Sequence, residues 1–134
     1  MDKKVHTVLL VDDDLAINYF HKRLLSKSDL SDVIITLYNG EVAIQALIEN
    51  NLTLTENDKL LVFLDLNMPI MNGWQFLDEY EKIKKSLKFE CKIFVLSSSI
   101  NPDDIKKAES NAFVSRYLAK PLSMDNVNYI KEYL

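Results

Sequence analysis

The chain lacks several features that would place it in a specialised class of protein. Cys91 is the only cysteine among 134 residues, so no disulfide can form within the chain. No apolar stretch follows residues 1–4, so the sequence shows no signal peptide or membrane-spanning segment. Acidic residues outnumber basic ones by 20 to 16, and a formal charge of −4 argues against nucleic acid as a partner. We therefore expect a cytoplasmic protein that binds neither membranes nor nucleic acid.

The length and composition are those of one globular domain. With 134 residues, 48% of them hydrophobic and 27% charged, the chain can bury a real core but has no room for a second folded module beside it. We therefore expect a single domain over residues 1–134, with no output domain, that acts through a partner protein.

Short apolar runs and segments of helical spacing alternate along the chain. Five runs are rich in β-branched, leucine or aromatic residues, which predicts strands covered on both faces: Thr7–Val11, Val33–Leu37, Leu60–Leu64, Lys92–Leu96 and Val114–Ala119. Five segments place apolar residues on one helical face, led by the sets Ile17, Phe20, Leu24; Ala43, Ala46, Leu47; Phe76, Leu77, Tyr80; Ile105, Ala108; and Val127, Ile130, Leu134.

This alternation predicts the fold class. Five strand–helix units favour an α/β protein with a doubly wound, parallel five-stranded sheet and helices on both faces, which is a three-layer sandwich. Pro102 and Ser123 are suitable helix starts, since proline fits the first turn and a serine hydroxyl caps free amides.

Carboxylates follow two of the predicted strands at their carboxyl ends. Asp12 and Asp13 come directly after the first strand, and Asp65 comes after the third. If these strands are neighbours in a parallel sheet, the side chains meet in one crevice, where their repulsion requires a cation or a proton. Hard oxygen ligands suit Mg²⁺, with Mn²⁺ as an alternative. The sequence thus predicts a divalent metal site.

Polar residues at the other strand ends extend this predicted site. Lys120, held extended by Pro121, supplies a cation that suits a phosphoryl group, and Ser97 supplies a hydroxyl that can donate to a phosphoryl oxygen. Asn67 lies in the loop after Asp65, where a backbone carbonyl can turn toward a metal. Taken singly, Ser97 could instead cap the next helix, and an Asp pair at a strand end is more often a turn or a helix cap.

The order and spacing of these residues resemble the motifs of a known protein family. The chain is similar to the receiver domain of two-component response regulators, most closely to stand-alone receivers of the chemotaxis type (CheY-like), over nearly its whole length. The matching motifs are Val11-Asp12-Asp13, Asp65 with Asn67-Met68-Pro69 and Asn72-Gly73, then Ser97, then Lys120-Pro121. The resemblance implies a flavodoxin-like fold with strand order 2-1-3-4-5.

The resemblance also assigns roles. It implies that Asp65 is the phosphoacceptor, assisted by Lys120 and Ser97, and that Asp13, Asp65 and the Asn67 carbonyl bind Mg²⁺ directly, with Asp12 acting through water. Tyr117 matches the aromatic switch that responds to Ser97, although tyrosine is also an ordinary strand residue. The implied phosphodonor is a phosphohistidine on a sensor histidine kinase or phosphotransfer protein.

Partners and other function classes are less defined by the sequence. The implied partners are an upstream kinase or phosphotransfer protein, an unknown downstream protein, and a second copy bound through the last two helices and the fifth strand. One alternative is a pseudo-receiver that binds without being phosphorylated. Another is a phosphatase or phosphotransferase, but such enzymes need an acid at position 67, which is asparagine. His6 and His21 have no partners at catalytic spacing, so we expect both to be solvated or structural.

Overall fold

The computed structural model describes residues 5–134, so residues 1–4 of the expected domain lie outside the described part of the chain. Five strands form a single sheet. They are β1 (Thr7–Val11), β2 (Val33–Leu37), β3 (Lys59–Leu64), β4 (Glu90–Ser97) and β5 (Val114–Ala119). Three of the five coincide with the predicted strands, while β3 and β4 extend slightly further.

All neighbouring strands are parallel, and their order is β2-β1-β3-β4-β5. The helices between and after them are α1 (Leu15–Ser26), α2 (Gly40–Glu49), α3 (Gly73–Ile83) with the short η1 (Lys84–Ser86), α4 (Pro102–Glu109) and α5 (Met124–Tyr133). The predicted flavodoxin-like fold class and strand order are confirmed. Pro102 begins α4, and the Ser123 side chain caps α5 as expected.

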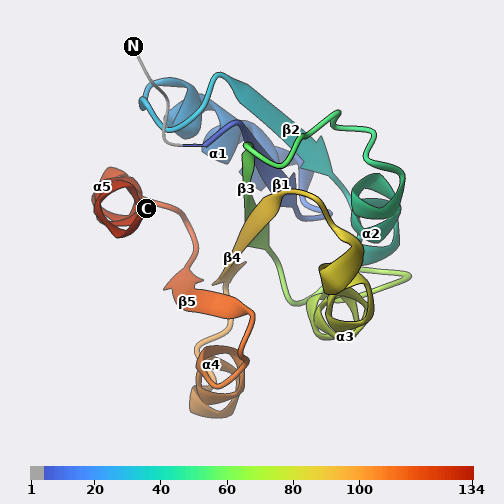
Figure 1. Ribbon diagram of the computed structural model, residues 1–134. Coiled ribbons are helices and arrows are strands. Elements are labelled where there is room, and N and C mark those ends of the chain that lie inside the picture. The colour runs from blue at the N-terminus through green and yellow to red at the C-terminus, as the bar shows by residue number, and fades with distance from the viewer. Residues whose placement is uncertain (1–4) are drawn as a thin grey trace.

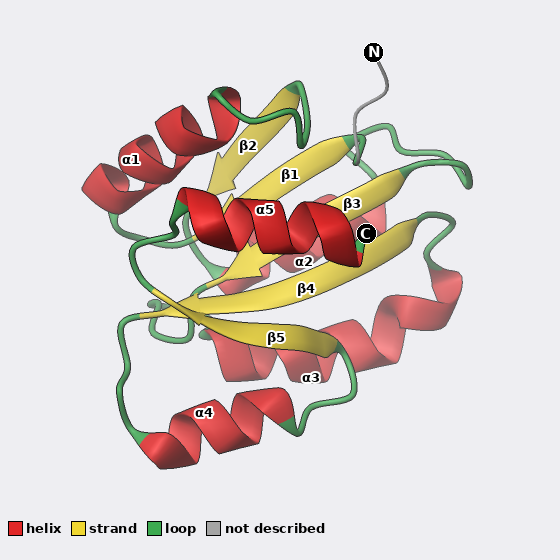
Figure 2. Ribbon diagram, turned by 90° about the vertical axis from the view of Figure 1, so that its left-hand side faces the viewer, coloured by secondary structure: helices red, strands yellow, loops and turns green. Residues whose placement is uncertain are grey.

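The sheet separates two hydrophobic cores (Figures 1 and 2). On one face, buried residues of α2, α3 and α4 pack against alternate side chains of the strands. On the other face, α1 and α5 cover a second cluster that includes Phe63 and Phe94 of the central strands. Because helices cover both faces, β1 is buried along its whole length and β3 at every residue but Lys59.

The buried face of α1 differs from the prediction. Apolar spacing indicated a face made of Ile17, Phe20 and Leu24, but Phe20 is 48% exposed. The buried residues are Asn18, His21 and Leu25. The prediction of Phe20 as a core residue is therefore wrong. It relied on hydrophobicity alone, whereas the inward-facing side of α1 includes the polar residues Asn18 and His21.

The carboxyl ends of the strands form one edge of the molecule. In Figure 2 the arrowheads point to the left of the view, and the loops that lead into α1, α4 and α5 begin there. Asp12, Asp65, Ser97 and Lys120 all belong to this edge, because each ends its strand or follows it directly. The fold thus gathers the residues that the sequence singled out.

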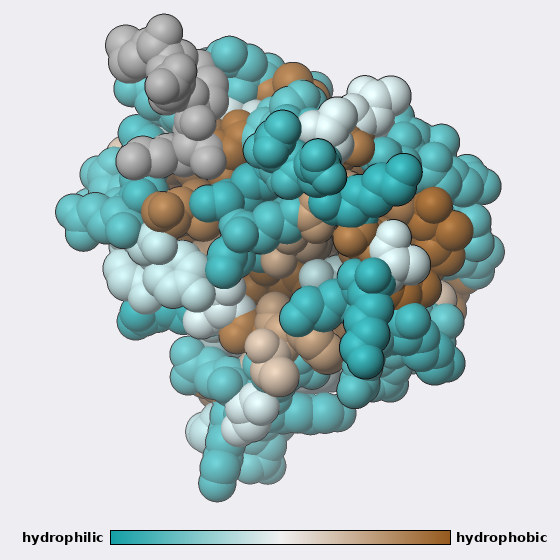
Figure 3. All heavy atoms as spheres, in the orientation of Figure 1, coloured by the Kyte–Doolittle hydropathy of each residue, from teal (hydrophilic) through white to brown (hydrophobic). Residues whose placement is uncertain are grey.

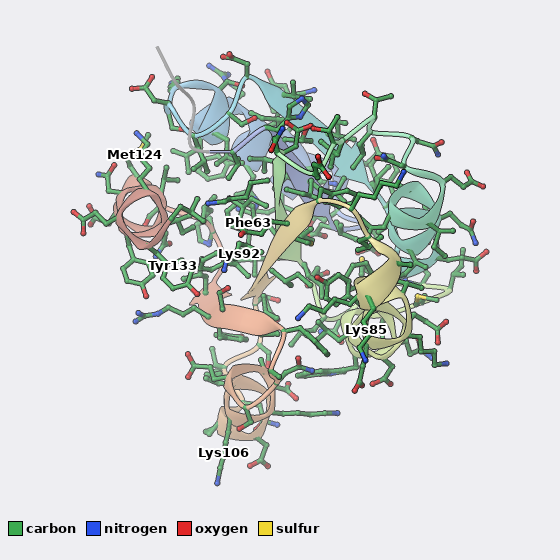
Figure 4. All side chains as sticks on the ribbon, in the orientation of Figure 1. Phe63, Lys85, Lys92, Lys106, Met124 and Tyr133 are labelled. Carbon is green, nitrogen blue, oxygen red and sulfur yellow. The ribbon has the colours of Figure 1, made fainter. Side chains whose placement is uncertain are left out.

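The edge at the amino ends of the strands has a mostly polar surface. Hydrophilic residues cover most of it, with smaller hydrophobic patches between them (Figure 3). Lys92 of β4 lies beside Tyr133 of α5, with its ammonium 5.9 Å from the ring centroid, while Phe63 points to the side of the sheet that carries α5 (Figure 4). Within residues 5–134, the helices are too short or too polar to cross a bilayer.

Candidate functional site

The local backbone places Asp65 at the centre of the carboxyl-end edge. Its N–H donates to the Val11 carbonyl at 2.9 Å, which continues the pairing of β3 with β1 by one residue. Gly73 at the start of α3 packs directly against this backbone: a Cβ there would overlap the Asp65 carbonyl oxygen and lie 2.9 Å from Leu66 Cα. A glycine is needed at this close approach, which explains the glycine in the motif.

Three carboxylates converge at the ends of β1 and β3. Asp12, Asp13 and Asp65 each offer an oxygen, and these oxygens all lie within 4.8 Å of one another. Asp12 and Asp65 are each 5% exposed, whereas Asp13 is exposed. Asp14, next in the chain, instead caps α1 by accepting the Ile17 N–H at 3.1 Å. The structure therefore brings together the three acidic residues that the sequence proposed as metal ligands.

Lys120 reaches this cluster from the end of β5. Its Nζ lies 2.5 Å from an Asp12 carboxylate oxygen and 3.3 Å from an Asp65 oxygen. Burial favours a neutral lysine, but the hydrogen bonds and charges of the two carboxylates outweigh it and raise the pKa of Lys120. The ammonium group is therefore charged and shared between two anions.

Even with Lys120 in place, the crevice has too little positive charge. Burial, together with the nearby Asp12 carboxylate, raises the pKa of Asp65 to about 6, although Lys120 and the Asn67 backbone N–H act in the opposite direction. The raised pKa means that the ionised carboxylate is destabilised in this crevice, and an added cation would stabilise it. Clustered carboxylate oxygens without nitrogen or sulfur donors suit Mg²⁺ or Mn²⁺, so the residues present fit the metal that the sequence predicted.

Asn67 and Ser97 are the next two predicted site residues, and they differ in the contacts that they make. The Asn67 backbone N–H lowers the pKa of the Asp65 carboxyl group, and a metal contact from the Asn67 carbonyl stays a prediction. Ser97 is fully buried, and its Oγ accepts the Ser99 N–H at 3.1 Å. Its backbone carbonyl accepts the Lys120 N–H at 2.9 Å, which ties the ends of β4 and β5 together.

Tyr117 is linked to the same loop. Its hydroxyl donates to the Ser99 carbonyl, so the predicted switch residue and Ser97 both contact Ser99. The Ser99 hydroxyl in turn donates to Asp104 of α4 at 2.7 Å. A continuous set of hydrogen bonds thus runs from Ser97 to the first turn of α4. The switching role of Tyr117 stays a prediction.

Sequence reasoning missed two residues beside the site, Asn18 and His21. Both are buried on α1, and both bond to the backbone of the site: Asn18 Nδ2 donates to the Asp12 carbonyl at 2.8 Å, and His21 Nε2 accepts the Leu122 N–H at 3.0 Å. The interpretation of His21 as structural is consistent with this contact. The only sequence signal was a pair of polar residues three positions apart on an otherwise amphipathic helix.

Known proteins match this sequence and this fold. The family model of the response regulator receiver domain matches residues 8–130. The chain belongs to this family. Receiver domains act with histidine kinases and phosphotransfer proteins in two-component signalling. The sequence-based resemblance is thereby confirmed.

Individual relatives support the assignment. A two-component response regulator from Cytophaga hutchinsonii aligns with a TM-score of 0.80 and 28% identity over 98% of this chain and 97% of its own. The phosphorylated cyanobacterial phytochrome response regulator RcpA aligns with a TM-score of 0.73 and 26% identity over 96% and 90%.

Among curated proteins, the nitrate/nitrite response regulator NarL of Escherichia coli K12 is 33% identical over 122 residues, which are 90% of this chain and 50% of NarL. This chain spans half or less of the length of the first curated relatives that it matches.

Proposed function

We propose that this receiver domain accepts a phosphoryl group on Asp65 from a phosphohistidine of a sensor histidine kinase or a phosphotransfer protein, in a reaction that requires Mg²⁺. The phosphorylated form then signals by binding a downstream protein. Asp12, Asp13, Asp65 and Lys120 carry the chemistry, Asn67 contributes a metal ligand through its carbonyl, and Ser97 and Tyr117 transmit the change.

The ammonium group of Lys120 is the observation that carries the proposal. It lies within 3.3 Å of Asp65 and within 2.5 Å of Asp12, inside a crevice that excludes most solvent. A cation held beside a nucleophilic carboxylate stabilises the negative charge that an incoming phosphoryl group brings. A structural ion pair would need one carboxylate beside Lys120, whereas this site keeps three together.

The chemistry follows from the positions of these side chains. An Asp65 carboxylate oxygen forms a bond to phosphorus as the phosphorus–nitrogen bond of the donor breaks, and the electron pair of that bond leaves with the imidazole nitrogen, which takes up a proton. Lys120 and the Ser97 hydroxyl bind oxygens of the transferred group. Phosphoryl transfer needs mainly such positioning and charge stabilisation. A bound Mg²⁺ would offset the repulsion between Asp65 and the anionic donor.

The hydrogen bonds around Ser99 support the proposed response. When Ser97 turns toward the phosphoryl group, its bond with the Ser99 N–H is disturbed, and Ser99 also bonds to Tyr117 and Asp104. The surface of α4, β5 and α5 would then change. We propose this surface as the site for the downstream partner or for a second copy of the chain.

Incubation with acetyl phosphate and Mg²⁺, followed by intact-mass measurement, tests the proposal. We expect wild-type protein to gain one labile phosphoryl group, and Asp65→Asn and magnesium-free samples to gain none. Asp14→Asn is a matched control, because Asp14 belongs to the same acidic run but its side chain caps α1, so this variant should still be labelled.

The result distinguishes the proposal from both alternatives. No labelling of folded wild-type protein would indicate a pseudo-receiver that acts by binding alone. Continuous release of inorganic phosphate that persists in Asp65→Asn would indicate a phosphatase whose nucleophile is another residue. Sedimentation velocity of the labelled and unlabelled protein would then show whether a second copy binds.

A further inference from the structure

Helix α1 buries two polar side chains where apolar ones would ordinarily lie. Asn18 is 4% exposed and His21 is 1% exposed, while Tyr19 beside them is 65% exposed. A buried polar group without a hydrogen bond costs about 1–3 kcal/mol, so this choice disfavours folding unless both side chains find partners. Their partners are not on neighbouring helices but on the backbone of the phosphorylation site.

Asn18 bonds to the residue that forms the shortest ion pair with Lys120. Its Nδ2 donates to the Asp12 carbonyl at 2.8 Å, six residues earlier in the chain. The Asp12 carboxylate also accepts the Asp14 N–H at 3.0 Å, so both the backbone and the side chain of Asp12 are restrained. The Asn18 Oδ1 is the one buried side-chain N or O atom without a partner in the described part of the chain. Among the described residues, the Asp12 carbonyl is therefore the one hydrogen-bond partner of the Asn18 side chain.

His21 bonds to the segment that follows Lys120. Its Nε2 accepts the Leu122 N–H at 3.0 Å, over a separation of 101 residues. Pro121 has no N–H, so Leu122 offers the first backbone donor after Lys120 itself. The Lys120 N–H is already bonded to the Ser97 carbonyl. The backbone that carries Lys120 is thus fixed on one side by β4 and on the other by His21.

The protonation state of His21 suits this bond. Burial lowers the pKa of His21 to about 4; the Asp12 and Asp14 charges oppose this shift and the Lys120 charge adds to it. The imidazole is therefore neutral near pH 7, with Nε2 unprotonated and free to accept. A leucine or valine at this position would fill similar space but would leave the Leu122 N–H without its partner.

We propose that His21 is a positioning residue for phosphoryl transfer: it holds the Lys120–Leu122 segment while Asn18 holds Asp12, so that α1 fixes both ends of the Lys120–Asp12 ion pair. This inference rests on the proposed function of Asp65. It assigns to α1 a part in the reaction, although no α1 side chain touches the transferred group.

Two substitutions that differ by one methylene test the proposal. His21→Gln carries an amide oxygen that can reach the place of Nε2, whereas the shorter side chain of His21→Asn cannot. Because small displacements of a reacting group cost a large part of its effect, we expect the initial rate of labelling by acetyl phosphate to fall on the order of tenfold in His21→Asn. In His21→Gln the rate should stay within about twofold of wild type.

A control variant separates positioning from loss of stability. Leu25→Ala removes a fully buried side chain one turn further along the same face of α1, where it is part of the hydrophobic core on that side of the sheet. Rates are compared per folded molecule, with the folded fraction taken from urea unfolding. Leu25→Ala should lower stability without lowering the rate, whereas equal slowing in Leu25→Ala and His21→Asn would overturn the proposal.

A double-mutant cycle tests whether His21 acts through Lys120. Lys120→Ala should slow labelling on its own, and adding His21→Asn should then slow it no further. An undiminished effect of His21→Asn in the Lys120→Ala background, or a wild-type rate in His21→Asn alone, would overturn the proposal and leave the function of Asp65 intact. Absence of labelling in wild type would instead overturn the proposed function and this inference with it.

Discussion

Helices α1 and α3 both cover the sheet, but they bury different chemistry. The buried face of α3 holds Phe76, Leu77 and Tyr80, whose rings and methyl groups fill the larger core. The buried face of α1 holds Asn18 and His21 at the site end, with Leu25 following one turn later. Helix α3 therefore contributes mainly to stability, whereas α1 gives up apolar burial to hold the backbone of the acidic crevice.

The largest effect in this comparison should come from Leu77→Ala in α3. Leu77 is 2% exposed, and truncating a buried leucine costs about 2–5 kcal/mol through lost burial and the cavity that remains. Urea unfolding followed by circular dichroism measures the loss. The labelling rate per folded molecule should stay at the wild-type value. A slowing as large as that in His21→Asn would show that α3 and α1 do not differ in the way described.

A smaller loss of stability, accompanied by slower labelling of Asp65, should come from Gly73→Ala at the start of α3. The added methyl group would overlap the Asp65 carbonyl, so the loop that carries the nucleophile must shift, at a cost of about 1–3 kcal/mol. Urea unfolding and the labelling rate should both show a loss. Asp78→Ala, on the exposed side of α3, is the matched control and should leave both unchanged. Normal labelling of Gly73→Ala would contradict this close approach.

The third effect is on the pH dependence of stability and concerns α1. His21 has a folded pKa of about 4, below its ordinary 6.5, so the unfolded chain takes up a proton first as the pH falls. The contribution of His21 is therefore constant above about pH 6.5 and is lost between pH 6.5 and 4. Relative to His21→Gln, wild type should lose about 2 kcal/mol of unfolding free energy between pH 7 and pH 5. The charges of Asp12, Asp14 and Lys120 face position 21 in both proteins, so the difference between the two pH profiles reports on the imidazole. Parallel pH profiles would contradict a buried neutral imidazole.

Much of the fold follows from local sequence patterns. The β1 and β2 strands have the predicted bounds because each is a short, mostly apolar run ended by polar residues or a turn. β5 also has the predicted bounds, although Ser115 and Arg116 interrupt its apolar residues. β4 begins at Glu90, two residues before the predicted start, because this exposed first residue still pairs with Lys59 of β3. Pairing, not hydrophobicity, sets that boundary.

The site was predictable for the same reason. Parallel strands joined by right-handed crossovers place their carboxyl ends on one edge, so Asp12, Asp65 and Lys120 were expected on the same edge once the strands were assigned, and the strand order implied by the resemblance made β1 and β3 neighbours. The family resemblance then supplied their roles. The contact of His21 with Leu122 could not be foreseen, because it joins α1 to a loop 101 residues away through a backbone N–H.

The face of α1 shows where such patterns fail. Hydrophobic spacing favoured Phe20, but the helix is rotated so that Asn18 and His21 face inward, and Phe20 is left half exposed. Hydrogen bonds to the Asp12 carbonyl and the Leu122 N–H compensate for burying these polar groups. A hydrophobicity pattern contains no information about such partners.

Mapping the phosphoryl group to a residue tests the central claim most directly. Borohydride converts an aspartyl phosphate to homoserine, so peptide mass spectrometry after labelling and reduction identifies the residue that was modified. We predict homoserine at position 65 and at no other aspartate, with the yield dependent on Mg²⁺. Homoserine at position 12 or 13 with position 65 unchanged would contradict the account.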